Sequence, residues 1–239
     1  MPDPTNSQPA TLRFRCPSEL KGWLPEPIPA AQGLPAWLKT MPAQAFNATA
    51  GADEDTVKRC PPFIDAMSAG FLIPLICDVV VEDGQLSWDI DLPPSEDAAF
   101  PRTPLGFHDP GQVTGTPLFD ADQFPLKFHN LWTIEAPAGY AVLFTHPFNR
   151  FDLPFTTLTG LVDCDRYHDA WIHFPAVWRD PGFAGVLPRG TPIAQCVPVR
   201  REAWGMETAA MTGAEAQRTH ATIESIAREK GVYRRKFRA

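Results

Sequence analysis

Proline constrains this chain more than any other feature of its sequence. The 239 residues include 27 prolines, and they are spread along the whole length. Because proline lacks a backbone donor and clashes with the preceding helical turn, long helices are not expected before about residue 210. Proline is compatible with strand ends, edge strands and fixed loops. The composition therefore predicts many short strands joined by rigid turns.

Apolar stretches rich in β-branched and aromatic residues recur between these breaks and predict the strands. Asp83-Gly84 joins two of them and is typical of a two-residue hairpin turn. Strands without intervening helices favour a mainly β, antiparallel sandwich or barrel. A polar loop is expected at residues 46–56, and a long loop at 91–111. The predicted strands lie within residues 11–16, 71–90, 126–137, 139–147, 155–163, 170–178 and 192–199.

The expected organisation is one β domain with an appendage at each end. Residues 1–10 are predicted to be disordered, residues 11–205 to form a single β domain, and residues 206–239 to form a helix with a basic tail. The β domain begins with a proline-rich wrap, in which a short helix is expected at residues 35–40. Thr212 and Glu215 have the spacing of a capping box, which predicts the start of the C-terminal helix.

The charge balance limits the classes of partner. The net charge is −7, from 21 basic and 28 acidic residues, and this argues against broad binding to nucleic acid or to an anionic membrane. The basic residues between Arg228 and Arg238 are interpreted as a solvated helix end. The first residues lack the pattern of a signal peptide, and no apolar stretch approaches ~18 residues. The expected location is the cytoplasm.

Two aspartates end the stretch "FTTLTGLVDCDRY", and they are the first candidates for chemistry. If the strand continues past Val162, Asp163 and Asp165 lie on the same face. A strand of this kind would hold a carboxylate rigidly enough to act as a general base. The structural alternative is that Asp163 caps a turn through backbone hydrogen bonds. The sequence leaves both interpretations open.

Four stretches, in their order along the chain, resemble motifs of the dUTP pyrophosphatase and dCTP deaminase superfamily. They are "SAGF", "APAGYAVLFTHP", "TGLVDCDRY" and "LPRGTPIAQCVPV". The resemblance implies a β-clip fold, a distorted antiparallel barrel. It also implies a homo-oligomer, because superfamily members are usually trimers with sites at subunit boundaries. The whole chain also resembles a family found in bacteria and tailed phages, which would make it a divergent member of the superfamily.

The same resemblance implies a site for a nucleotide-like molecule. Asp163 takes the position of the aspartate that faces the deoxyribose and a catalytic water, so Asp163 and Asp165 are the predicted catalytic residues. A nucleotide hydrolase of this kind would use Mg²⁺. The predicted substrate-binding residues near the second and third motifs are His146, Asn149, Arg150, Arg166 and Tyr167.

The sequence departs from the superfamily pattern at several positions. These departures weaken the inference of nucleotide hydrolysis more than the inference of the fold. Leu72 replaces the aspartate of the first motif, and Thr191 and Pro192 replace the acid and arginine of the fourth. The segment "THPFNRF" stands where the superfamily has Pro-Arg-Ser-Gly. A glycine-rich fifth motif, which closes over the triphosphate, is absent from the sequence.

The segment "HPFNRFDLPF" suggests a pocket, because it is dense in aromatic and polar residues. Phe148, Phe151 and Phe155 would form its walls. The alternative is a loop that covers one end of the barrel, in which Arg150 and Asp152 pair with each other.

Histidines suggest a different chemistry. His129, His146 and His173 are weak candidates for a mononuclear site with Asp163, which would hold Fe²⁺ or Zn²⁺ as in cupin-like enzymes. A strand histidine is more commonly a packed, hydrogen-bonded residue. Among the five cysteines, Cys77 and Cys196 are expected to be buried thiols, and the flanking aspartates are expected to raise the pKa of Cys164.

Three functions therefore remain open from the sequence. The first is a protein with a site for a nucleotide-like small molecule, with hydrolase activity as one form. The second is a non-catalytic binding or assembly protein that kept the β-clip fold. The third is a metal-dependent enzyme that uses histidines and an aspartate.

Overall fold

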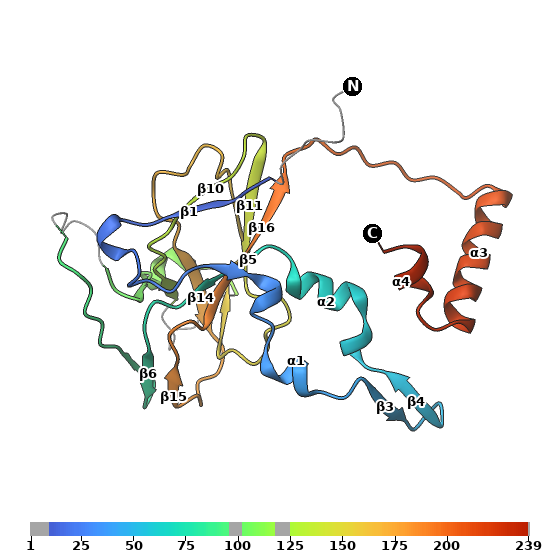
Figure 1. Ribbon diagram of the computed structural model, residues 1–239, viewed down its shortest axis with the longest axis horizontal. Coiled ribbons are helices and arrows are strands. Elements are labelled where there is room, and N and C mark those ends of the chain that lie inside the picture. Colours follow the sequence, from blue (N-terminus) through green and yellow to red (C-terminus); the bar gives the residue numbers. More distant parts are fainter. Residues whose placement is uncertain (1–9, 96–101, 118–124, 239) are drawn as a thin grey trace. The chain divides into compact units, whose positions relative to one another are not determined.

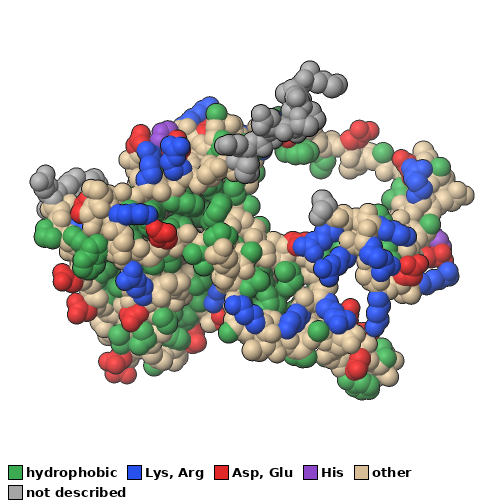
Figure 2. All heavy atoms as spheres, viewed as in Figure 1, with side chains coloured by type: hydrophobic (Ala, Val, Ile, Leu, Met, Phe, Trp, Pro, Cys, Tyr) green, Lys and Arg blue, Asp and Glu red, His purple; other side chains and the backbone are tan. Residues whose placement is uncertain are grey.

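The computed structural model describes residues 10–95, 102–117 and 125–238 (Figure 1). The predicted disordered segment 1–10 lies outside the described residues except for Ala10. The chain divides into two compact units, Met1–Arg201 and Glu202–Ala239. Figure 2 shows one face of the surface, where charged and hydrophobic side chains are mixed.

The largest sheet of the first unit has five antiparallel strands. The longest strand, β16, lies at its centre between β11 and β5, which are themselves strands of mainly buried residues. The register pairs Phe144 with both Cys196 and Gly160. In spatial order, the strands are β13 (Gly160–Val162), β11 (Tyr140–Thr145), β16 (Pro192–Arg200), β5 (Phe71–Pro74) and β2 (Ile28–Pro29).

A second antiparallel sheet of four strands packs against the first through aromatic side chains. The rings of Phe144 on β11 and Phe174 on β14 have centroids 5.4 Å apart, and within the second sheet those of Phe128 on β9 and Phe155 on β12 lie at 4.7 Å. Each buried aromatic side chain removes roughly 150–250 Å² from water, so these contacts dominate the core. The strands, in order, are β12 (Phe155–Thr157), β14 (Phe174–Trp178), β9 (Leu126–Phe128) and β8 (Leu105–Phe107).

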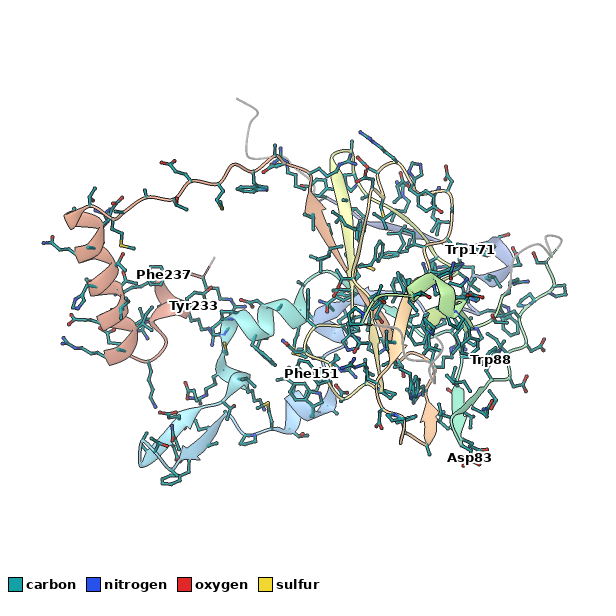
Figure 3. All side chains as sticks on the ribbon, turned by 180° about the vertical axis from the view of Figure 1, so that it is seen from behind. Asp83, Trp88, Phe151, Trp171, Tyr233 and Phe237 are labelled. Atoms are coloured by element: carbon teal, nitrogen blue, oxygen red, sulfur yellow. The ribbon has the colours of Figure 1, made fainter. Side chains whose placement is uncertain are left out.

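Three smaller sheets complete the strand set of the described residues. The predicted hairpin turn is confirmed: Asp83 and Gly84 have φ of 49° and 73°, as a two-residue hairpin turn requires (Figure 3). The predicted polar loop at 46–56 is wrong, because it contains most of a two-stranded hairpin. These strands are β15 (Gly185–Leu187) with β6 (Val79–Glu82) and β7 (Gln85–Ser87), β1 (Arg13–Arg15) with β10 (Thr133–Glu135), and β3 (Gln44–Asn47) with β4 (Ala52–Asp55).

The mainly β, antiparallel class predicted from the sequence is confirmed. Within the described parts of the chain, however, each sheet has two free edges, and none closes into a barrel. A second apolar cluster lies beneath the proline-rich N-terminal segment, where Leu20, Leu24, Leu131 and Trp132 are buried. Proline removes the donors needed for a continuous strand, so this segment joins the sheet only through the two-residue strand β2.

Helices in the first unit are short, as the prolines predict. The expected helix near residues 35–40 is present as α1, and Pro61 and Pro62 occupy the first positions of α2, where proline is tolerated. The α-helices are α1 (Ala36–Thr40) and α2 (Pro61–Ser68), and the 3₁₀ helices are η1 (Ser18–Leu20), η2 (Ala30–Gln32), η3 (Val57–Arg59) and η4 (Pro110–Val113).

The second unit consists of the longest helix, α3 (Gly213–Arg228), and the short helix α4 (Val232–Lys236). The predicted capping box is confirmed, because the Thr212 and Glu215 side chains each accept a hydrogen bond from the other residue's backbone N–H. Gly231, with φ of 74°, separates the two helices. Among the described residues, no helix is both long and apolar enough to cross a membrane.

Candidate functional site

The two aspartates of "GLVDCDRY" lie on a turn and not on a continued strand. Strand β13 ends at Val162, and the carbonyl of Asp163 accepts hydrogen bonds from the backbone N–H groups of Arg166 and Tyr167, each at 2.8 Å. The expectation that strand alternation aligns Asp163 with Asp165 is therefore wrong. The turn brings the two carboxylates together by a different route.

Arg201 binds both carboxylates. Its Nη1 lies 2.8 Å from Asp163 Oδ1, and its Nη2 contacts Asp165 Oδ2. The Asp165 side chain is only 6% exposed, whereas the Asp163 side chain is 51% exposed. We call these three residues the Asp163–Arg201–Asp165 cluster. Sequence reasoning missed Arg201, because it lies beyond the predicted strand at 192–199 and far along the chain from the two aspartates.

This cluster joins three segments of the first unit. Asp165 Oδ2 also accepts a hydrogen bond from the N–H of Gly139 at 2.9 Å, and the N–H of Arg201 donates to the Gly139 carbonyl at 2.8 Å. The turn before β11, the turn after β13 and the end of β16 are thereby held together. Of the carboxylates predicted to activate water, each has one oxygen bound by Arg201, and Asp165 also accepts from a backbone amide.

His146, predicted as a substrate contact, uses both ring nitrogens within the protein. Its Nε2–H donates to the carbonyl of Arg150 at 2.9 Å, and its Nδ1 accepts from the N–H of Thr157 at 3.3 Å. Burial lowers the pKa of His146, so the ring is neutral at pH 7. The tautomer that satisfies both contacts makes His146 a link between the 146–150 turn and β12.

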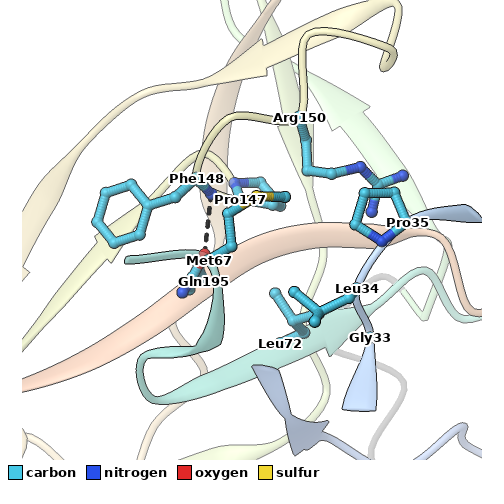
Figure 4. A pocket seen from close by; sticks show the side chains of 9 residues that line it. All are labelled: Gly33, Leu34, Pro35, Met67, Leu72, Pro147, Phe148, Arg150 and Gln195. Carbon is cyan, nitrogen blue, oxygen red and sulfur yellow. Dashed lines mark hydrogen bonds between the residues drawn. The ribbon is translucent and has the colours of Figure 1, made fainter. Parts of the chain in front are cut away.

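The segment around Asn149 and Arg150 encloses very little space. Asn149 adopts φ of 59° in a tight turn, and Arg150 forms a bidentate ion pair with Asp152, with its shortest contacts at 2.9 Å. Phe151 is 90% exposed and Phe155 is 1% exposed, so neither lines an open pocket. The void beside this segment has a volume of about 10 Å³, which is room for one water-sized group (Figure 4).

Gln195 holds this turn in place and was not recognised from the sequence. It is buried in the middle of β16, where its Oε1 accepts from the N–H of Phe148 at 2.8 Å. Its Nε2 donates to the carbonyls of Ala66 and Ala69 at the end of α2, at 3.0 and 2.6 Å. The available signal was a polar residue inside an otherwise apolar strand, which implies a buried partner.

The three candidate metal ligands do not form one group. His129 and His173 are neighbours, with ring centroids 4.7 Å apart, but His146 makes the separate contacts described above. His129 Nδ1 lies 3.0 Å from the Thr103 carbonyl, and His173 Nδ1 accepts from the N–H of Asn130 at 3.2 Å. Within the described ranges, no three His, Cys, Asp or Glu side chains are placed to share a metal ion.

Burial controls the ionisation of these groups. It lowers the pKa of His173 to about 4, with His129 and Lys127 adding to the effect, and it also lowers the pKa of His129. Burial, followed by Asp163 and Asp165, raises the pKa of Cys164 to about 11, in the predicted direction. Cys77 and Cys196 are buried as expected, with raised pKa values. These thiols are therefore protonated and unreactive at pH 7.

An open cavity lies beside the loop that leads from the 163–167 turn to β14. Its volume is about 480 Å³, within the range of roughly 300–1,000 Å³ typical of small-molecule sites. Tyr167, one of the predicted substrate-binding residues, contributes to its wall, and Trp171 is marked in Figure 3. The lining residues of the described chain are Pro17, Glu19, Ser95, Arg102, Tyr167, Asp169, Ala170, Trp171 and His173.

Arg102 is the cation in this wall. Its Nη1 donates to the Pro93 carbonyl at 2.6 Å, while its Nη2 is buried and has no hydrogen-bond partner among the described residues. As a lining residue, Arg102 brings a positive charge to the cavity wall, where it would attract an anionic group of a ligand. Arg166, in contrast, is exposed on the turn and does not line the cavity.

Comparisons of this chain with protein-family models, with curated proteins and with solved structures find no match. The functional argument therefore rests on the cavity and on the chemistry of the side chains around it.

Proposed function

We propose that this chain is a divergent β-clip protein that binds a nucleotide-like small molecule in the cavity lined by Arg102, Tyr167 and Trp171. The single observation that carries the proposal is a cavity of ligand size whose wall combines the guanidinium of Arg102 with the aromatic side chains of Tyr167 and Trp171. The order of the four superfamily-like stretches along the sequence supports the β-clip assignment.

The lining chemistry matches the parts of a nucleotide. Tyr167 and Trp171 offer aromatic faces on which a base can stack. Arg102 offers a guanidinium for a phosphate, with which arginine forms strong charge-assisted hydrogen bonds. Glu19 and Asp169 offer carboxylate oxygens, which accept hydrogen bonds from the exocyclic amino group of a base. His173 is neutral at pH 7, so its Nε2–H is a donor without added charge.

The arrangement of the acids favours binding over hydrolysis. A general base must reach its water with a free lone pair. In the Asp163–Arg201–Asp165 cluster, Arg201 binds one oxygen of each carboxylate, the Gly139 amide binds the same oxygen of Asp165, and the other Asp165 oxygen is buried away from water. The cluster therefore supports the turn that presents Tyr167, and we assign no water-activating role to it.

Calorimetric titration of the full chain tests this function. The panel consists of nucleoside monophosphates, the matching nucleosides and inorganic phosphate, each with and without Mg²⁺. We expect a monophosphate to bind more tightly than either of its parts. Tyr167→Ala should weaken binding about tenfold or more, because base stacking contributes roughly 1–3 kcal/mol. Arg102→Gln should weaken the binding of the monophosphate and leave the binding of the nucleoside unchanged.

Two controls separate binding in this cavity from binding elsewhere on the protein. Arg179→Gln removes an exposed arginine that does not line the cavity, and it should bind as the parent chain does. Asp163→Asn tests the superfamily position. If Asp163→Asn abolishes binding while Arg102→Gln and Tyr167→Ala retain it, the cavity is not the site. A complete lack of saturable binding across the panel would reject the proposed function itself.

A further inference from the structure

The wall of the open cavity carries more negative than positive charge. Glu19 and Asp169 contribute a carboxylate each, and Arg102 contributes a guanidinium. His173 adds no charge at pH 7, because burial lowers its pKa to about 4. With one positive against two negative charges, the lining residues of the described chain carry a net charge of −1. A ligand with one anionic group can pair with Arg102, but each further anionic group meets a wall that is already negative.

This charge balance limits the number of phosphate groups that the cavity accepts. A monophosphate places its charge against a guanidinium, with which it forms charge-assisted hydrogen bonds. A triphosphate adds further negative charges, and like charges placed together weaken binding. The stretches outside the described residues contain no Lys, Arg or His, so they supply no further cationic side chain. The cavity is therefore suited to a nucleoside monophosphate and not to a free triphosphate.

The carboxylates also determine which base fits the cavity. An ionised carboxylate only accepts hydrogen bonds, and its two oxygens can accept from two adjacent donors. Guanine presents two such donors side by side, its N1–H and its 2-amino group. Adenine and cytosine each present one amino group beside an unprotonated ring nitrogen. Uracil presents one N–H between two carbonyl oxygens, which repel a carboxylate. Guanine is therefore the base that a carboxylate in the wall binds best.

Glu19 is the better placed of the two carboxylates. Asp169 Oδ1 already accepts from Arg15 Nη2 at 3.4 Å, and Asp169 Oδ2 lies 3.7 Å from His168 Nε2. Neither oxygen of Glu19 has a hydrogen-bond or ion-pair partner among the described residues. Glu19 lies on η1, and the next residue, Leu20, is completely buried and fixes this turn against the body. Glu19 therefore presents its carboxylate to the cavity from an anchored backbone.

We propose that the cavity selects guanine nucleoside monophosphates, with Glu19 determining the base and Arg102 contacting the single phosphate. This inference rests on the function proposed above, because it names the ligand class of the same cavity. Tyr167 and Trp171 stack on the base, and a purine offers them more surface than a pyrimidine does. The neutral ring of His173 brings an N–H donor, which suits the O6 and N7 acceptors of guanine.

Calorimetric titration of the full chain with matched nucleotides tests this inference. GMP and IMP differ only in the 2-amino group, and GMP and GTP differ only in the number of phosphates. We expect GMP to bind about tenfold or more tightly than IMP, because IMP lacks the second donor to Glu19. UMP should bind more weakly than either. Without Mg²⁺, GTP should bind about fivefold or more weakly than GMP, and this difference should shrink at high salt, which screens the repulsion.

Glu19→Gln tests the residue that determines the base. Glutamine has one acceptor oxygen in place of two and also donates through its amide, so the variant should lose the preference for GMP over IMP. It should bind AMP at least as tightly as the parent chain does, because glutamine pairs with adenine. The loss of one negative charge should also bring the affinity for GTP closer to that for GMP. Glu26→Gln is the matched control, because Glu26 is an exposed acid of the same segment that does not line this cavity.

The outcomes separate this inference from the proposed function. If nucleotides bind but UMP or IMP binds as tightly as GMP, the base assignment is wrong and the proposed function stands. Tighter binding of GTP than of GMP without Mg²⁺ contradicts the limit of one phosphate. If Glu19→Gln weakens all nucleotides by the same factor, or keeps the parent preference for GMP, Glu19 does not determine the base. A lack of saturable binding by every nucleotide rejects the proposed function and this inference together.

Discussion

At the residue scale, Asp165 has a role different from that of its neighbour Asp163. Both contact Arg201, but Asp165 is buried and also accepts a hydrogen bond from the Gly139 amide. Removing one partner from a buried ion pair leaves the other charge uncompensated, whereas an exposed pair contributes little. The same residue type two positions apart therefore acts as a structural anchor in one case and as a half-exposed surface acid in the other.

We expect Asp165→Asn to lower the free energy of unfolding by about 2–3 kcal/mol, somewhat less than a fully buried pair because Arg201 is partly exposed. Asp163→Asn should lower it by less than about 1 kcal/mol. Urea denaturation followed by tryptophan fluorescence measures both. Equal effects of the two substitutions would contradict the anchoring role of Asp165.

The lowered pKa of His173 makes the free energy of unfolding depend on pH. Its pKa is about 4 in the folded chain, against about 6.5 in the unfolded chain, because burial disfavours the charged ring. Below pH 6.5 the unfolded state therefore binds more protons, and stability is lost as the pH falls from about 6.5 toward 4. The loss from this residue is on the order of 2–3 kcal/mol. His129 and His146 act in the same direction.

Unfolding titrations at pH 7.5, 6 and 5 measure this dependence. His173→Asn keeps an acceptor near the position of Nδ1 but does not titrate, so its stability should fall less steeply with pH. Gln217→Ala, on the exposed surface of α3, changes no titrating group and should keep the parent slope. A parent-like slope in His173→Asn would contradict the prediction.

At the element scale, Gly70 controls how α2 connects to β5. It has φ of 67°, and a Cβ at this position would overlap the carbonyl oxygen of Cys196 on the neighbouring strand β16. Backbone atoms in a paired strand cannot move away cheaply. Gly22 has a similar φ of 86°, but no atom lies within 4 Å of the place a Cβ would occupy.

Substitutions at the two glycines therefore distinguish the cost of backbone strain from the cost of steric overlap. Gly22→Ala should cost about 1 kcal/mol, because its conformation is left-handed. Gly70→Ala should cost about 3 kcal/mol or more, or prevent folding, because the overlap adds to the same strain. The expression yields and urea midpoints of the two variants measure these costs. Comparable midpoints would be inconsistent with a tight contact at Gly70.

Predictability also differs between elements. The β6–β7 hairpin follows from Asp83-Gly84, because few dipeptides adopt positive φ at both positions. The β3–β4 hairpin is stabilised by polar pairs, with Gln44 donating to Asp55 at 2.9 Å and Asn47 to Glu54 at 2.7 Å. Exposed polar strands carry no hydrophobic alternation, so the sequence pattern was typical of a loop.

At the scale of the whole molecule, the core of the first unit is built from residues between Leu12 and Cys196. Arg201 is the last residue of that unit and closes the Asp163–Arg201–Asp165 cluster. Loss of Arg201 should therefore destabilise the first unit, although this residue is the last of the unit.

Two truncations test this expectation. A chain that ends at Glu202 keeps Arg201 and serves as the reference for the shorter chain. A chain that ends at Arg200 loses the cluster and should be about 2–3 kcal/mol less stable. Near-UV circular dichroism reports the packing of the buried tryptophan. Similar stability of both truncations would show that Arg201 does not anchor the first unit.

The sequence by itself determined the features that depend on neighbouring residues. The mainly β class, the short helices, the Asp83-Gly84 turn and the capping box at Thr212 all follow from local geometry. Tyr167 was predicted as a ligand contact, and it does line the open cavity, although on a turn that the strand pattern did not foresee.

Only the tertiary structure decided which distant residues meet. It brought Arg201 to Asp163 and Asp165, closed the space around His146 and Arg150, and placed Glu19 and Arg102 beside Tyr167. Side-chain charge and size are properties of the sequence, but a cavity or an ion pair depends on how sheets pack. Packing joins residues that are far apart in the chain, and no local pattern records those contacts.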